Sequence, residues 1–232
     1  MSTAALTASS SVKEIRGVYK YCDDWCEYCR VTAQCASHRV RREWQARHGT
    51  STPMDRSDLI AFTREVAAAD GDTTGGLDAV LVGDPKREYQ PIPADEQMVR
   101  TANQFAVGAA FLLTKTGWTP PASGVLGRPP SAQEVLAWYH VFLAARAGHA
   151  FVAAARADRG IVGEREDAQG SAKIALISID RSRTALERLA GISHGKICRH
   201  LIQMLNTLKA GLEARIPGAR EFVRIGLDAP VV

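Results

Sequence analysis

The chain has 232 residues, of which 46% are hydrophobic and 23% are charged, so it can build a sizeable core and lacks a disordered composition. Its net charge of +4 is small, and it is concentrated in residues 30–48, where five arginines accompany one glutamate. Nucleic-acid binding over the whole surface is therefore not expected, and any basic contact is expected beside this segment.

Residues 1–11 are small and polar and lack a basic stretch followed by an apolar run, so we expect a disordered leader and no secretory signal. The most apolar stretches, 106–113 and 141–155, are too short to cross a bilayer or contain Arg146 and His149. We therefore expect a cytoplasmic protein without membrane contact. Thiols stay reduced in that compartment, which favours metal binding over disulfides.

Residues 12–50 predict a cysteine-rich metal-binding segment between two short helices, at 12–20 and 38–47. Residues 51–94 predict a third short helix at 55–69, with Asp55 as its cap, and then a connector rich in glycine and proline. This connector is the expected boundary between the cysteine-rich part and the rest of the chain.

Four long helices are predicted beyond the connector, at about 95–116, 131–159, 168–190 and 196–214, because apolar residues recur there in steps of three and four. Ser131 and Glu134 have the spacing of a capping box at the start of the second helix. Because the connections are short, we expect an antiparallel four-helix bundle over 95–216, followed by a C-terminal tail at 217–232. The predicted fold class is all-α.

Four of the five cysteines lie within 14 residues, with the spacing C-x3-C-x2-C-x5-C, and His38 follows the last of them. Thiolates bind soft metal ions strongly, and this spacing lets four of them reach one centre. The predicted ligands are Cys22, Cys26, Cys29 and Cys35. The fifth cysteine, Cys198, is expected to pack within a helix.

The spacing favours a [4Fe–4S] cluster, used for electron transfer or redox sensing with a redox partner or a regulatory protein. Four aromatic residues could shield such a cluster from water: Tyr19, Tyr21, Trp25 and Tyr28. The alternative is a structural zinc site of four cysteines, or of three with His38. In that case the arginine segment would contact nucleic acid or an acidic protein. Reduced thiols that merely pack are the third interpretation.

Polar residues of the long helices give weaker signals. Glu-x-x-His does not occur in the chain, so a ferritin-like di-iron site is not expected, and His140 and His149 lie on opposite sides of their helix. Arg146, His149 and Asp180 could line an enzyme pocket if they faced inward. We favour a salt-bridged helix face for the stripe that contains Lys173, Asp180 and Glu187.

Two segments together resemble a group of uncharacterised bacterial proteins. One is Cys22-Asp-Asp-Trp-Cys-Glu-Tyr-Cys29, and the other runs from Gly170 to Ser182 and begins Gly-Ser-Ala-Lys. Proteins of this group combine a short cysteine-rich start with a helical remainder. The resemblance implies that the two segments are joint signatures of one architecture, and it implies no cofactor, substrate or activity.

Overall fold

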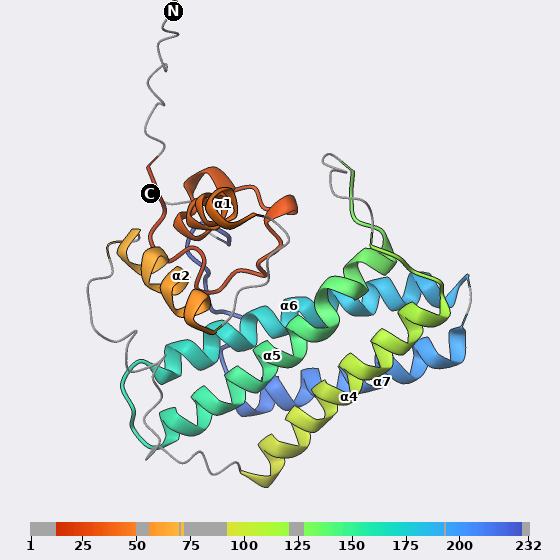
Figure 1. The fold of residues 1–232 in the computed structure, drawn as a ribbon. Helices are drawn as coiled ribbons and strands as arrows, with labels where there is room; N and C mark the ends of the chain where they lie inside the picture. The colour runs from red at the N-terminus through yellow and green to blue at the C-terminus, as the bar shows by residue number, and fades with distance from the viewer. Residues whose placement is uncertain are drawn as a thin grey trace, which may run out of the picture. The chain divides into compact units, whose positions relative to one another are not determined.

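The computed structural model describes residues 13–49, 56–69, 71, 92–120, 128–192 and 194–228, and every regular element in these ranges is helical. The all-α class is thus confirmed for the described part of the chain (Figure 1). The chain forms two compact units. Unit 1 comprises Met1–Lys20, Tyr28–Arg87 and Ile225–Val232, and unit 2 comprises Tyr21–Glu27 and Glu88–Arg224.

Unit 1 contains a short 3-10 helix η2 (Thr32–Gln34) and the helices α1 (Ala36–His48) and α2 (Arg56–Ala69). The ring of Trp44 on α1 meets the ring of Phe62 on α2 edge to face, with 6.2 Å between centroids. A second small cluster is made by Ile15, Val18 and Val31.

The helix predicted at 12–20 is wrong over its described residues, because residues 16–20 form turns. Val18 and Lys20 donate backbone hydrogen bonds to Ile15 and Gly17, each three residues back. Gly17 has a φ of 70°, in the left-handed region, which interrupts helical hydrogen bonding. Apolar residues of this stretch are nevertheless buried, since Ile15 and Val18 both belong to the small cluster.

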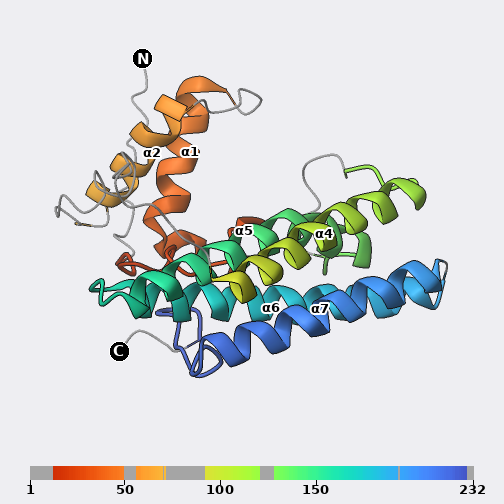
Figure 2. The same cartoon turned by 90° about the horizontal axis from the view of Figure 1, so that it is seen from below.

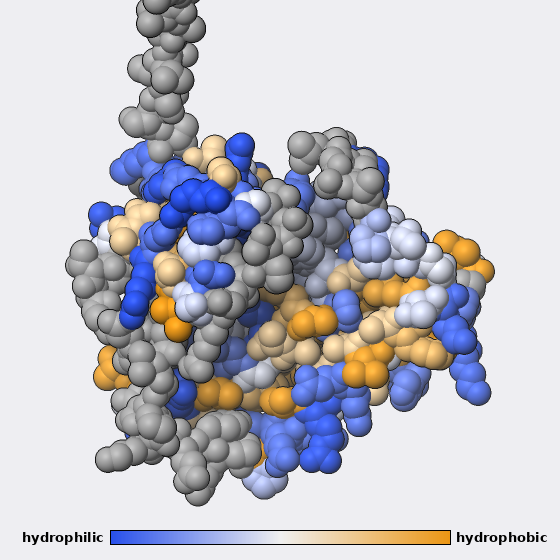
Figure 3. All heavy atoms as spheres, viewed as in Figure 1, coloured by the Kyte–Doolittle hydropathy of each residue, from blue (hydrophilic) through white to orange (hydrophobic). Residues whose placement is uncertain are grey.

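Unit 2 contains the four long helices α4 (Pro93–Lys115), α5 (Ala132–Asp158), α6 (Glu164–Ala190) and α7 (Gly195–Arg215). Helix α4 packs against α5 and α7, and α6 packs against the same two helices (Figure 2). Their shared core includes Phe105, Leu143, Phe151, Ile179 and Leu205, all fully buried. The outer face of α4 and α5 carries exposed apolar side chains, among them Val107, Phe111 and Val141 (Figure 3).

The starts of α5 and α6 show how local sequence sets a helix boundary. The capping box is confirmed: the Ser131 hydroxyl accepts from the Glu134 amide, and the Glu134 carboxylate accepts from the Ser131 amide. Helix α6 begins at Glu164, about one turn before the predicted start at residue 168. Its first turn carries three acidic residues, which the helix dipole favours there.

Three predictions fall outside the described residues: the disordered leader at 1–11, the cap at Asp55 and most of the connector at 70–94. Within the described ranges, none of the helices combines the length and the hydropathy that a membrane crossing needs.

Candidate functional site

The cysteine segment is divided between the two units. Cys22 and Cys26 belong to unit 2, and Cys29 and Cys35 belong to unit 1. Cys26 begins the short 3-10 helix η1 (Cys26–Tyr28), and Cys35 is the residue that precedes α1. All four are half-buried with free thiols, whereas Cys198 is fully buried in α7, as expected.

In unit 2, the segment around Cys22 and Cys26 is fixed to α5 by two residues, Asp23 and Trp25. The Trp25 ring stacks on that of Trp138 with 5.3 Å between centroids and 9° between planes, and it meets Tyr139 edge to face at 5.7 Å. The backbone oxygen of Asp23 accepts a 2.9 Å hydrogen bond from the Trp138 indole. The two neighbours of Asp24, whose φ is 55°, are therefore both held against α5.

The Asp23 carboxylate accepts hydrogen bonds from two side chains of the long helices. It receives the Tyr139 hydroxyl at 2.6 Å and the Arg181 guanidinium of α6 at 2.5 Å. Arg181 also contacts the Tyr139 hydroxyl. Tyr139 is fully buried, and this burial, together with the negative Asp23, raises the pKa of its hydroxyl. The phenol therefore stays protonated and donates at any working pH.

Tyr21 makes the second attachment to the long helices. Its hydroxyl donates to one oxygen of Asp167 at 2.9 Å, and its ring meets Phe222 edge to face at 5.0 Å. His149 lies 3.3 Å from the other oxygen of Asp167, and this hydrogen bond holds the pKa of Asp167 below its usual value. A glycine at position 170 leaves room for the Tyr21 ring on α6.

Burial raises the pKa of the Cys22 thiol to about 12. The backbone of Asp24 and the positive Arg146 act in the opposite direction, and the negative charges of Asp23 and Asp24 add to the rise. Without a bound cation this sulfur is therefore a neutral thiol at physiological pH. A metal ion that bound here would displace the proton.

In unit 1, Cys29 and Cys35 pack against the cluster of Ile15, Val18 and Val31. The pKa of Cys35 is raised, chiefly by burial and further by the nearby Cys29. The backbone at the start of α1 opposes this rise, because amides at a helix N-terminus favour a thiolate. Both cysteines thus pack against the same small apolar cluster, and Cys29 is near enough to affect the charge of Cys35.

The donor set of the cysteine segment fits a soft metal in kind and in number, since it offers four free thiols. Across the described ranges, however, no three side chains of Cys, His, Asp or Glu are grouped as metal ligands. His38 lies half-buried in the first turn of α1, within one turn of Cys35. The chemistry of the donors supports a metal, and no coordination geometry follows from their positions.

The arginines of the basic segment make contacts within unit 1. Arg39 binds Glu14 at 2.7 Å and Glu43 at 3.3 Å, and Arg47 binds Glu65 at 2.6 Å. The guanidinium of Arg30 donates to the backbone oxygen of Leu227 at 2.6 Å. Much of the charge that an acidic partner would use is already engaged.

The hypothetical enzyme trio of Arg146, His149 and Asp180 is not brought together. His149 binds Asp167, whereas Asp180 forms a 2.7 Å ion pair with Arg220. Asp167 and Asp180 are on the same helix, roughly 20 Å apart along its axis at 1.5 Å per residue. The Arg146 guanidinium lies over the ring of Phe142, with 5.3 Å to its centroid. A salt-bridged face for α6 agrees with these contacts.

The comparisons of this chain with protein-family models, with curated proteins and with solved structures gave no match. The contacts of Asp23, Trp25 and Tyr21 therefore stand on their own as the evidence that positions the cysteine segment.

Proposed function

We propose that the protein binds a metal centre through Cys22, Cys26, Cys29 and Cys35, and that this centre is a [4Fe–4S] cluster. The observation that carries the proposal is the set of four free, half-buried thiols within 14 residues of turn and 3-10 structure. Such a cluster would supply one-electron chemistry, in electron transfer or in redox sensing with a redox or regulatory partner. A reducing compartment, the cytoplasm, keeps these thiols available.

The protein's own residues have two tasks in this proposal. Asp23 and Trp25 restrain the backbone on either side of Asp24, and so limit where Cys22 and Cys26 can point. The apolar cluster of unit 1 does the same for Cys29 and Cys35. We take the four long helices as an antiparallel four-helix bundle that serves as the rigid support for the Asp23 and Trp25 contacts.

The small core of unit 1 also favours a metal. Among its described residues the buried hydrophobic ones are few: Ile15, Val18, Val31, Ala36, Val40, Trp44 and Val66. Units that bury little apolar surface are often held together by a metal or by disulfides. Cys29 and Cys35 are free thiols, so they are available to bind a metal that would cross-link this unit.

A structural zinc site remains the second candidate, and the position of His38 favours it. His38 and Cys35 lie within one turn of each other at the start of α1, a spacing found in compact zinc sites. The further idea that the arginines then contact nucleic acid or an acidic protein is weaker, since Arg39 and Arg47 already pair with glutamates.

Anaerobic purification of the full chain tests the proposal and separates the two metals. We expect a visible absorption band that dithionite bleaches, and about four iron atoms per chain by elemental analysis, as a [4Fe–4S] cluster requires. If the protein is colourless and contains zinc, the [4Fe–4S] cluster is wrong and the structural zinc site is favoured. A purified protein that contains neither iron nor zinc would overturn both candidates.

Serine variants of the four cysteines locate the centre. Cys22→Ser, Cys26→Ser, Cys29→Ser and Cys35→Ser should each reduce the bound metal severalfold or more. The matched control is Cys198→Ala, which removes the one cysteine outside the segment and should leave the metal content unchanged. Equal loss in the control would mean that the purified metal is held elsewhere.

A further inference from the structure

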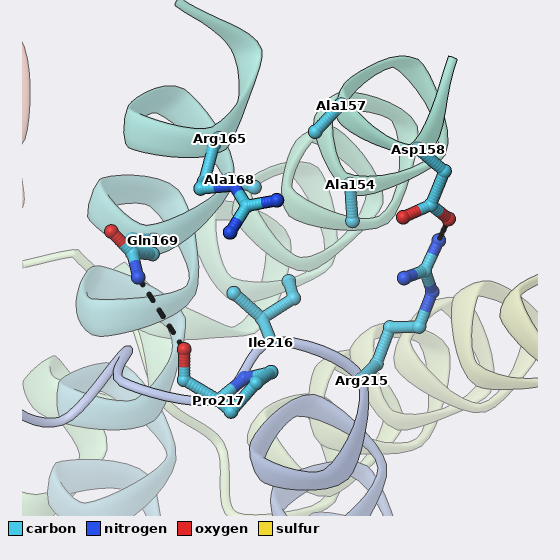
Figure 4. Close-up of a pocket in the computed structure, with 9 residues that line it drawn as sticks. All are labelled: Ala154, Ala157, Asp158, Arg165, Ala168, Gln169, Arg215, Ile216 and Pro217. Atoms are coloured by element: carbon cyan, nitrogen blue, oxygen red, sulfur yellow. Dashed lines mark hydrogen bonds and ion pairs between the residues drawn. The ribbon is translucent and has the colours of Figure 1, made fainter. Parts of the chain in front are cut away.

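A cavity of about 280 Å³ lies in unit 2 where α5 ends, α6 begins and α7 ends (Figure 4). Its apolar lining consists of small or short side chains, including Ala154, Ala157, Ala168 and Ile216. Ligand pockets start at about 300 Å³, and a water molecule occupies about 30 Å³ in the liquid, so the space holds roughly ten heavy atoms. None of the proposed metal ligands lines it.

Two guanidinium groups face this cavity from different helices. The Arg165 side chain, from the first turn of α6, extends into it (Figure 4) and makes no ion pair or hydrogen bond with any part of the chain that the structure describes. Arg215, at the end of α7, uses its Nε on both oxygens of Asp95 at 3.2 Å and its Nη2 on Asp158 at 2.5 Å. Its remaining nitrogen is directed toward the cavity (Figure 4).

The rigidity of the cavity comes from these same contacts. Asp95 is 2% exposed, so its ion pair with Arg215 is shielded from water and fixes that guanidinium. On the opposite side, the Gln169 amide donates to the backbone oxygen of Pro217 at 3.4 Å and holds the chain that follows α7. The site is therefore largely formed before any ligand arrives, which lowers the entropic cost of binding.

We infer that this cavity binds a small monocarboxylate with a short apolar body. A planar carboxylate matches the fork of Arg165, whose charge has no counter-ion among the described residues. The alanines and Ile216 suit an apolar tail of a few carbons. The Asp158 carboxylate at the rim disfavours a dianion such as phosphate, and a neutral ligand would gain no ion pair with the exposed Arg165. This inference is independent of the proposed metal function.

Calorimetric titration of the full chain with hexanoate tests the inference. Few polar contacts and a partly open site predict a Kd of about 0.1–1 mM. Hexanamide, the uncharged analogue, should bind at least about tenfold more weakly, because Arg165 loses its charged partner. Inorganic phosphate should neither bind measurably nor compete with hexanoate.

Two variants and one control assign the site. Arg165→Gln should weaken hexanoate binding about tenfold or more, and Ala157→Leu should abolish it by filling the cavity while the unfolding temperature stays unchanged or rises. Arg188→Gln removes an exposed arginine near the other end of α6 and should bind like the wild type. Equal hexanoate affinity in Arg165→Gln and the wild type, or equal binding of hexanamide, would overturn the inference.

Discussion

Asp23 shows how one side chain can position a loop that has no regular structure. Its carboxylate accepts hydrogen bonds from Tyr139 and Arg181, and its backbone oxygen accepts from Trp138. Tyr139 is fully buried, and its hydroxyl donates to Asp23. A buried donor that loses its acceptor costs free energy, whereas Arg181, whose side chain is 49% exposed, can be solvated by water.

Asp23→Ala is therefore expected to lower the free energy of unfolding by about 1–3 kcal/mol, measured by chemical denaturation. The control is Glu27→Ala, in the same segment, whose side chain is exposed and which should change stability by less than about 0.5 kcal/mol. A loss below about 1 kcal/mol for Asp23→Ala would mean that the segment is not held by this carboxylate.

For single residues, the sequence predicted which side chains could bind a metal but not which partners hold them in place. The four cysteines could be picked out because they are close in the chain, and close spacing alone limits how far apart their sulfurs can lie. The partners of Asp23 and Tyr21 could not be predicted, because Tyr139 and Asp167 are more than a hundred residues away. Tyr21 and Trp25 were assigned to an insulating shell, and the structure shows that both also attach the segment to the helices.

At the level of the helices, Gly170 and Gly148 can be compared by replacing each with alanine. A Cβ at position 170 on α6 would overlap the ring of Tyr21, whereas a Cβ at position 148 on α5 would meet nothing among the described residues. We expect Gly170→Ala to destabilise by about 1–3 kcal/mol, because the Tyr21 ring must move. Gly148→Ala should stabilise by about 0.5–1 kcal/mol, because alanine is the better helix former. Thermal unfolding of both variants measures the difference, and two shifts of the same sign would contradict the close contact.

The start of α5 gives a prediction about pH. Arg128 binds both oxygens of Glu134, at 2.7 and 2.8 Å, and with the Ser131 amide it lowers the pKa of Glu134 from 4.5 to about 2. A carboxyl whose pKa is depressed by folding adds stability above its unfolded pKa, and this stability is lost as pH falls through the folded pKa. The contribution is therefore complete above a pH of 4.5 and disappears toward a pH of about 2.

Glu134→Gln keeps an acceptor for the Ser131 amide but loses the ion pair with Arg128. Near neutral pH this variant should be less stable than the wild type by about 1 kcal/mol. This value is reduced from that of a buried pair, because Arg128 is exposed and solvent screens the interaction. The difference in stability should vanish as the pH is lowered toward ~2. Urea denaturation at several pH values measures it. Glu96→Gln breaks the well-exposed pair with Arg100 and is the control that should change little. A pH-independent difference for Glu134→Gln would contradict the assigned ion pair.

Elements were predictable where periodicity extends over several turns. The four long helices could be placed within about one turn, because each repeats its apolar residues over many positions. The stretch 12–20 has the same repeat over only two turns, and there the backbone preference of Gly17 outweighed the pattern. The early start of α6 was missed because its first turn consists largely of acidic residues, which the helix dipole favours there. Such a turn carries no apolar repeat from which a helix could be predicted.

At the scale of the whole molecule, the two units differ in how much apolar surface they bury. Unit 2 has a continuous core of large side chains such as Phe105, Phe151 and Leu186, whereas the described residues of unit 1 bury few large side chains. Stability within one chain need not be uniform, and segments with few buried contacts open first. If the proposed metal is bound, most of its effect on backbone protection should therefore appear in unit 1.

Hydrogen exchange of the metal-loaded chain and of the chelator-treated chain measures this effect. We expect amides of α1 to exchange at least about tenfold faster after metal removal, because Cys29 and Cys35 no longer restrain unit 1, while amides of α6 keep their protection. Cys35→Ser should reproduce the loss in α1 without a chelator, and Cys198→Ala should not. If α1 is equally protected with and without metal, the metal does not stabilise unit 1, and the cluster would need to be justified by its redox chemistry alone.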